Sequence, residues 1–194
     1  MKDFPAILAF DTSAAHCAAA LLLDGQVVSR VEEMSRGQGE RLIVLLEEFL
    51  AENNTTWGDL DAIAVGVGPG NFTGIRISVS AARGLALGLG IPAMGVSLFD
   101  TTQMLSKQAQ VAVPAPRDQA YMMDFDKQIK PAMAHKNQFA AAAMSTSYNA
   151  SDHVVSMVQI AAKHASPETP RPAPLYVRPA DAAPPRDKPP VLLP

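Results

Sequence analysis

The fold of this chain is decided by residues 61–96, which read DAIAVGVGPGNFTGIRISVSAARGLALGLGIPAMGV. Residues 61–67 form an apolar run that predicts a buried strand, and residues 74–89 have the length and composition of a helix. Residues 91–96 predict another strand directly after that helix. A strand, a crossover helix and a second strand form a right-handed parallel unit, so this stretch predicts the centre of an α/β sheet.

The residues before this stretch extend the sheet with antiparallel strands. Three strands are predicted there, at residues 5–11 (PAILAFD), 15–23 (AHCAAALLL) and 26–34 (QVVSRVEEM). Asp24 and Gly25 indicate a two-residue hairpin, because both central positions of a type I′ turn need positive φ. A helix over residues 39–52 then leads to strand 61–67. The element order predicts a mixed five-stranded sheet flanked by helices, which is the order of the ribonuclease H-like fold and of each half of the actin-like ATPases.

The residues after 96 are expected to form a smaller second lobe. The predicted elements are a helix at 98–108, two short strands within 109–125 around a Pro-Ala-Pro turn, a helix or loop at 129–149, an amphipathic helix at 152–164 capped by Ser151 or Asp152, and a short strand at 174–179. The last 28 residues contain 10 of the 16 prolines, which predicts an extended segment. We therefore expect an N-terminal lobe at 1–100, a shortened C-terminal lobe at 101–178 and a proline-rich tail at 179–194.

Composition limits the classes of protein to which the chain can belong. It is 48% apolar and 18% charged, which is enough for a packed core, and it has no run of 18 apolar residues that would predict a transmembrane helix. The single cysteine, Cys17, excludes a disulfide framework. The short apolar stretch at the N-terminus ends at Asp11 and predicts a strand rather than a signal peptide, so we expect a cytoplasmic protein.

Charge is divided unevenly along the chain. Residues 1–100 carry 6 basic and 12 acidic side chains, a net charge of −6, whereas residues 101–194 carry 10 basic and 7 acidic side chains. An acidic surface repels phosphate, so the first half is a poor surface for nucleic acid. We expect any contact with RNA to depend mainly on another protein.

A phosphate or nucleotide site is predicted where strand 5–11 ends and where the glycine-rich loop enters helix 74–89. The candidate residues are Asp11, Thr12, Ser13, Gly68, Gly70, Asn71 and Thr73. A carboxylate and two hydroxyls can hold a metal-bound phosphate, and glycines let a ligand approach backbone amides at a helix N-terminus. The alternatives are ordinary turn bonding at Asp11 and a purely structural strand-to-helix turn. No Gly-Lys-Ser/Thr follows, so the loop is not a Walker A motif.

Arg76 lies in the first turn of that helix, where its charge opposes the helix dipole. We therefore expect a partner to hold it, such as Asp11 or an anion.

Helices 39–52 and 74–89 are also predicted to form an interface with another subunit. The apolar stripe of helix 39–52 is wider than one sheet face requires, and helix 74–89 is rich in small residues. The candidate interface residues are Leu42, Leu45, Leu46, Phe49, Ser78, Ala81, Ala82 and Leu85. Burial under the second half of the chain is the alternative.

Catalytic and metal-binding patterns are absent from the sequence. The histidines are His16, His135, His153 and His164, and none forms an HExxH or HxxxH motif. No GxSxG motif is present. His153 and His164 are expected on the solvated side or at the end of one helix. We predict neither a catalytic residue nor a metal ligand.

Four segments together resemble the TsaB (YeaZ) family, which has often been labelled glycoprotease-like or peptidase M22-like. They are ILAFDTSAAHCAAALL at 7–22, RGQGERLIVLLEEFL at 36–50, the long stretch 60–97 and, more weakly, APLYVRPADA at 173–182. The resemblance implies an actin-like ATPase fold. It also implies a non-catalytic subunit of the bacterial complex that transfers a threonylcarbamoyl group to adenosine 37 of ANN-reading tRNAs.

The same resemblance implies particular partners. The chain would pair with the catalytic homologue TsaD and activate it, the ATPase TsaE would bind the heterodimer, and the chain alone would form a homodimer through the same helices. ATP or ADP would bind, if at all, at the interface of the complex, and tRNA would be met only through that complex. The alternative from another class is a stand-alone enzyme, either an ATP-dependent phosphotransferase or a glycoprotease-like metallopeptidase.

Overall fold

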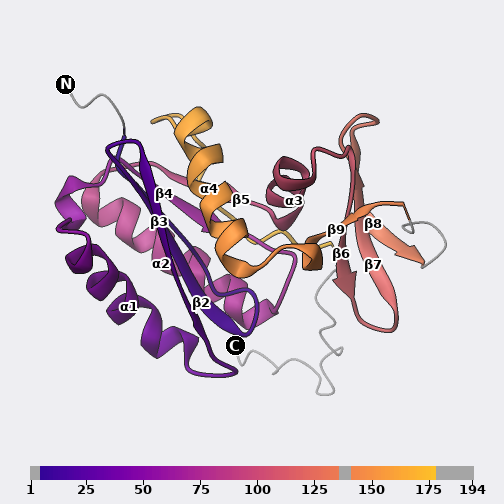
Figure 1. Cartoon of the computed structure of the whole chain (residues 1–194), viewed down its shortest axis with the longest axis horizontal. Helices are drawn as coiled ribbons and strands as arrows, with labels where there is room; N and C mark the ends of the chain where they lie inside the picture. Colours follow the sequence, from indigo (N-terminus) through magenta and orange to yellow (C-terminus); the bar gives the residue numbers. More distant parts are fainter. Residues whose placement is uncertain (1–4, 136–140, 178–194) are drawn as a thin grey trace, which may run out of the picture.

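The computed structural model describes residues 5–135 and 141–177, which form two β-sheets with helices packed on them (Figure 1). The first sheet has the strand order β3-β2-β1-β4-β5. Its strands are β1 (Ile7–Asp11), β2 (His16–Leu23), β3 (Gln26–Glu33), β4 (Ala62–Gly66) and β5 (Ala93–Val96). β2 pairs antiparallel with β1 and β3, whereas β4 pairs parallel with β1 and β5. The predicted mixed five-stranded sheet and its fold class are confirmed.

The hairpin between β2 and β3 has the predicted turn. Leu23 lies opposite Gln26, and Asp24 and Gly25 have φ values of 49° and 77°. Both residues are in the left-handed region that a type I′ turn requires. This turn fixes the register that directs Leu21 toward the core.

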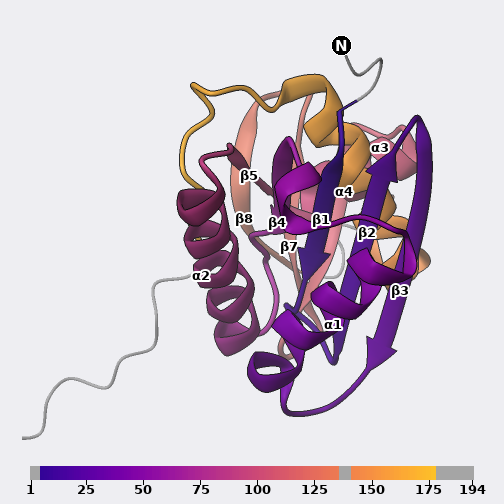
Figure 2. The same cartoon turned by 90° about the vertical axis from the view of Figure 1, so that its left-hand side faces the viewer.

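Helices cover both faces of the first sheet (Figure 2). α1 (Gln38–Glu52) and α2 (Phe72–Leu89) pack on one face, and α4 (Ala150–His164) packs on the other. Met157 and Val158 of α4 join Ala9 and Ala20 in a second core cluster. The second half of the chain therefore completes the core of the first sheet. The division of the chain at residues 100 and 178 stays a prediction.

The second sheet has the order β8-β7-β6-β9, and α3 (Leu98–Ser106) packs on it through Phe99. Its strands are β6 (Gln110–Ala115), β7 (Gln119–Asp124), β8 (Ile129–His135) and β9 (Ala143–Met144). The two strands predicted within 109–125 are confirmed, but Pro114 lies inside β6 and the turn falls at Arg117 and Asp118, both with positive φ.

The prediction of a helix or loop for residues 129–149 was wrong for 129–135 and 143–144, which are strands, and its residues 136–140 lie outside the described part of the chain. These residues include β8, β9 and the short 3-10 helix η3 (Ser145–Ser147). Alanine and methionine have little intrinsic strand preference, so the local pattern does not indicate β8. Pairing with β7 decides its conformation instead, because strand formation depends on the neighbouring strand.

The helix starts differ slightly from those predicted. Asn71 caps α2, accepting a 2.9 Å bond from the Gly74 amide. α4 is capped by Asn149 rather than by Ser151 or Asp152, because Asp152 takes the third helical position and completes a capping box with Asn149.

The segment after α4 contains no strand between 174 and 177, contrary to the prediction for 174–179. Instead, the Leu175 amide donates a single 2.8 Å bond to the Val67 carbonyl. Residues 178 and 179 and the predicted tail at 179–194 lie outside the described residues. None of the described helices has both the length and the apolarity needed to cross a membrane.

Candidate functional site

A cavity of about 340 Å³ opens beside the carboxyl ends of β1, β4 and β5. Ligands commonly bind at this edge of an open α/β sheet. Its polar lining residues are Asp11, Ser13, His16, Glu33, Ser97, Thr101, Ser145, Thr146, Tyr148, Asn149 and His153. They come from both halves of the chain, so the cavity lies between the first sheet and the segment that joins β9 to α4.

Asp11 is held by residues of its own turn. Its Oδ2 accepts hydrogen bonds from the amide of Ser13 at 3.1 Å and from the Ser13 hydroxyl at 2.8 Å. The Nε2 atom of His16 lies 3.2 Å from the same oxygen. The turn bonding considered as the alternative for Asp11 is therefore present, and this carboxylate oxygen has contacts with three atoms of two residues, Ser13 and His16.

The glycine-rich loop packs against that turn. The Thr12 hydroxyl donates to the Gly74 carbonyl at 2.7 Å, and the Asn71 amide donates to the Ser13 carbonyl at 2.6 Å. A Cβ atom on Gly74 would overlap the Thr12 carbonyl oxygen, and one on Gly70 would crowd the Ser13 carbonyl oxygen. These two glycines allow two backbone segments of the same chain to approach closely, which is a structural role.

The seven residues predicted to bind phosphate are therefore only partly brought together. Asp11, Ser13 and Gly68 line the cavity. Thr12 is fully buried, and its hydroxyl is used in the packing just described. Gly70, Asn71 and Thr73 lie on the surface and outside the lining of the cavity.

The charge of the cavity does not suit a polyphosphate. Among its described lining residues, Asp11 and Glu33 are acidic and none is lysine or arginine. Phosphate-binding sites use cationic side chains and free backbone amides, but the amides of Ser13, Asn71 and Gly74 already have partners. The residues of this cavity therefore do not fit a nucleotide.

His153 was predicted on the solvated side or at the end of its helix; it lies near the start of α4 and lines the cavity. Its Nδ1 lies 2.8 Å from the Thr101 hydroxyl and its Nε2 lies 3.1 Å from the Ser145 carbonyl, so it connects α4, α3 and η3. Burial lowers the pKa of His153 below its usual value of 6.5. The position of His153 at the start of an amphipathic helix gave no signal of these partners, which come from distant segments.

Arg76 has a partner, although not the one predicted. Its guanidinium carbon lies 3.9 Å from the centre of the Phe72 ring, and its Nε donates to the Tyr176 hydroxyl at 2.9 Å. The rings of Phe72 and Tyr176 stack with their centres 5.2 Å apart. Aromatic faces stabilise a cation, so Arg76 needs neither Asp11 nor an anion.

The helix face predicted to be an interface also needs correction. Six of its eight residues are buried within this chain: Leu42, Leu45, Leu46, Phe49, Ser78 and Ala82. Ala81 and Leu85 are partly buried and pack against the same core. The apolar residues that α1 and α2 direct outward are different: Ile43 is 37% exposed, Val44 47% and Leu87 76%.

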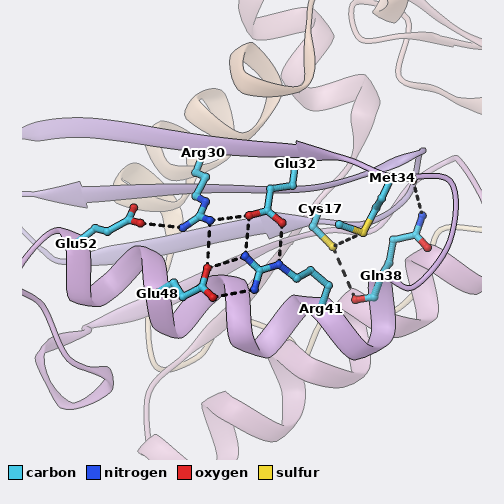
Figure 3. Close-up of polar contacts among 8 residues, drawn as sticks. All are labelled: Cys17, Arg30, Glu32, Met34, Gln38, Arg41, Glu48 and Glu52. Atoms are coloured by element: carbon cyan, nitrogen blue, oxygen red, sulfur yellow. Dashed lines mark hydrogen bonds and ion pairs between the residues drawn. The ribbon is translucent and has the colours of Figure 1, made fainter.

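α1 is fixed to the sheet by a network of ion pairs (Figure 3). The Arg41 guanidinium contacts Glu32 of β3 at 2.7 Å and Glu48 at 2.6 Å, and Arg30 contacts Glu32, Glu48 and Glu52. Hydrogen bonds from Arg41 are the main cause that lowers the pKa of Glu32 to about 2. The network ties α1 to β3 and so fixes which face of α1 is outward.

Cys17 lies beside this network, between its strand β2 and helix α1 (Figure 3). Its Sγ atom is 3.8 Å from Met34 Sδ and 3.7 Å from the Gln38 carbonyl oxygen. Burial raises the pKa of the Cys17 thiol to about 11. The thiol is therefore protonated at neutral pH and is a packing residue of the strand rather than a nucleophile.

Comparison with known proteins places these features in one family. The family profile described as "TsaD: tRNA N6-adenosine threonylcarbamoyltransferase" matches residues 31–175. The tRNA threonylcarbamoyladenosine biosynthesis protein TsaB of Escherichia coli K12 is 41% identical over 95 residues, which are 49% of this chain and 41% of the relative. TsaB of Buchnera aphidicola subsp. Schizaphis graminum is 34% identical over 125 residues, 61% of this chain and 60% of the relative. The chain thus matches two-fifths to three-fifths of these curated relatives.

Solved structures agree with this relationship. A Pseudomonas aeruginosa protein described as similar to the peptidase YEAZ is 26% identical, with a TM-score of 0.70 over 90% of this chain and 100% of that one. YeaZ from Pseudomonas aeruginosa is 25% identical, with a TM-score of 0.62 over 81% of this chain and 92% of that one. The chain belongs to the family of the TsaD profile, and within it to the TsaB (YeaZ) relatives.

Proposed function

We propose that this protein is a non-catalytic partner subunit in the synthesis of threonylcarbamoyladenosine in tRNA. It binds a TsaD-type catalytic homologue through the outward face of α1 and α2 and activates transfer of the threonylcarbamoyl group to adenosine 37 of ANN-reading tRNAs. A TsaE-type ATPase binds that heterodimer, and the chain contacts tRNA only as part of the complex. The isolated chain pairs with a second copy of itself through the same face. These events take place in the cytoplasm.

The observation that carries the proposal is the outward face of α1. Ile43 and Val44 are more than one-third exposed, although the rest of the apolar stripe of this helix is buried in the chain's own core. Two adjacent exposed β-branched apolar side chains on a helix held rigidly by ion pairs favour a protein interface, because apolar side chains fixed in place lose little entropy when a partner covers them.

The cavity supports a non-catalytic role through the groups that it contains. Asp11 Oδ2, an obvious candidate for a base, already has contacts from Ser13 and His16. The lining offers no arginine or lysine, within the part of the chain that the structure describes, to neutralise charge on a phosphoryl group. The TsaB names of the relatives support a role in tRNA modification.

Reconstitution tests this proposal. Purified TsaD and TsaE homologues from the same organism are supplied with threonylcarbamoyl-adenylate and tRNA, with and without this chain, and modified adenosine is measured. We expect little product without the chain and a rate that saturates at one chain per TsaD homologue. Equal rates with and without the chain would overturn the proposal, and product formed by the chain alone would show that the chain is itself catalytic.

A further inference from the structure

A second hollow in the surface, separate from the cavity, lies beside the C-terminal half of α2. It has a volume of about 470 Å³ and is bounded on its other side by residues 167–172, which follow α4. Leu87, Ile91, Pro92 and Pro172 supply an apolar wall, and Arg83 and Arg171 stand on its two sides. We call this hollow the α2 groove.

The α2 groove is held in a fixed shape. The segment after α4 is anchored by the bond from the Leu175 amide to the Val67 carbonyl, and the Leu175 side chain packs against the core clusters of both sheets. A Cβ atom on Gly95 would lie 3.3 Å from Pro172 Cβ, so the segment runs close against β5. A groove that exists before binding does not have to be ordered by its ligand, which favours affinity.

The charged groups of the α2 groove are all positive. Arg83 and Arg171 are its only charged lining residues, and within residues 5–135 and 141–177 neither one makes an ion pair. Arg30 and Arg41, by contrast, each contact two or three carboxylates. Arg83 belongs to the first half of the chain, whose net charge is −6, and Arg171 belongs to the second half, so the two halves together place two positive charges on this groove.

The apolar wall of the α2 groove is open as well. Leu87 is 76% exposed, and no atom lies within 4 Å of a Cβ built on Gly84 or Gly88, so the helix backbone is accessible beside it. A nucleic-acid phosphate would satisfy the arginines but would leave Leu87 and the prolines uncovered. A protein segment can satisfy both, because carboxylates pair with guanidinium groups in a two-bond geometry and an apolar side chain covers leucine.

We propose that the α2 groove binds an acidic segment of the TsaD-type partner, with carboxylates directed at Arg83 and Arg171 and an apolar side chain seated against Leu87 and Pro92. This inference rests on the proposed function and adds the chemistry of the partner segment. It also makes association depend on salt, because opposite charges exposed to solvent attract each other less at higher ionic strength.

The test is titration calorimetry of the full chain with the TsaD homologue at several salt concentrations. Arg83→Gln combined with Arg171→Gln is expected to raise the dissociation constant at least tenfold at low salt and to flatten its salt dependence. Arg83→Lys with Arg171→Lys keeps the charge and should retain most of that dependence. Leu87→Ser should weaken binding without changing the salt slope. Arg117→Gln, in the turn between β6 and β7, is the matched control and should match wild type.

The possible outcomes separate the two proposals. If wild type binds and the double glutamine variant binds equally well with an unchanged salt slope, the α2 groove is not a docking site and the proposed function still stands. If that variant instead loses only the tRNA affinity of the complex, the groove binds RNA and the inference is wrong. If wild type does not bind the TsaD homologue at all, both proposals fail. Circular dichroism of each variant confirms that it is folded.

Discussion

At the scale of single residues, Gly74 and Gly84 show how two glycines of one helix have opposite roles. Gly74 faces the Thr12 backbone so closely that a methyl group would overlap its carbonyl oxygen, whereas nothing lies within 4 Å of a Cβ built on Gly84. Packing requires the first glycine, whereas the second lowers the stability of the helix relative to alanine. The sequence shows only that both are glycines in or near a predicted helix.

Two alanine substitutions test this difference. We expect Gly74→Ala to lower the free energy of unfolding by about 3 kcal/mol, because backbone must move to accept the methyl group. Gly84→Ala should raise it by about 1 kcal/mol, the difference in helix propensity. Urea unfolding followed by circular dichroism measures both. Equal effects of the two changes would show that the loop does not pack on the Asp11–Ser13 turn as described.

The titration of Glu32 predicts how stability depends on acid. Its pKa is lowered from 4.5 to about 2 in the folded protein, so the carboxylate stabilises the fold fully above pH 4.5. That stabilisation is lost as the pH falls from 4.5 toward 2, because the unfolded chain takes up the proton first. In Glu32→Gln we expect a lower free energy of unfolding at pH 7 and a flatter pH dependence below 4.5, measured by urea unfolding at each pH.

His153 acts in a different range of pH. Burial lowers its pKa below 6.5, so protonation favours the unfolded chain and stability falls as the pH drops below 6.5. His153→Gln should remove that part of the pH dependence while leaving the part below 4.5 unchanged. A variant that retains the full loss of stability just below pH 6.5 would mean that another group is responsible.

At the scale of elements, α1 has an inner face in the core and an outer face at the surface. Leu46 is fully buried and Val44 is 47% exposed, although the two lie only two positions apart. We expect Leu46→Glu to lower the free energy of unfolding by about 3–5 kcal/mol, because it buries an unpaired charge. Val44→Glu should leave the fold intact and weaken the association of the protein with the TsaD homologue and with a second copy of itself. Urea unfolding measures the first effect and sedimentation the second.

The opposite pattern would reverse this assignment of faces. A Leu46→Glu protein that is as stable as wild type, or a Val44→Glu protein that is unfolded, would show that α1 is rotated about its axis. Glu47→Gln provides the control, because Glu47 is exposed on the outer face and its replacement by glutamine introduces no new negative charge there.

Elements with a strong local pattern could be predicted, and those that depend on distant partners could not. The turn at Asp24 and Gly25 and the strand-helix-strand unit at 61–96 were predicted because each has its own signal. β8 has none, since its pairing with β7 determines it. The facing of residues 42–46 was harder to predict, because leucine, isoleucine and valine occupy them without a break; burial of Leu42, Leu45 and Leu46 in the core, together with the ion pairs to β3, fixes the rotation of the helix.

At the scale of the whole molecule, the two halves of the chain depend on each other. α4 covers the first sheet, and Leu175 packs against the clusters of both sheets. The cavity forms between these parts, so its residues from the second half, such as Thr101, Ser145 and His153, could not be predicted from the end of β1 alone. Only Asp11, Ser13 and Gly68 of the predicted site lie there, because the other residues of the loop serve its packing or lie on the surface.

We propose that the protein acts through the outward face of α1 and α2 rather than through chemistry in the cavity. The most direct test is the rate of threonylcarbamoyladenosine formation by the TsaD and TsaE homologues, supplied with wild type, Val44→Glu or His16→Gln, each shown to be folded. We predict that His16→Gln stimulates the reaction as wild type does and that Val44→Glu loses at least tenfold of the stimulation. A His16→Gln protein that fails to stimulate, beside a fully active Val44→Glu protein, would contradict the claim.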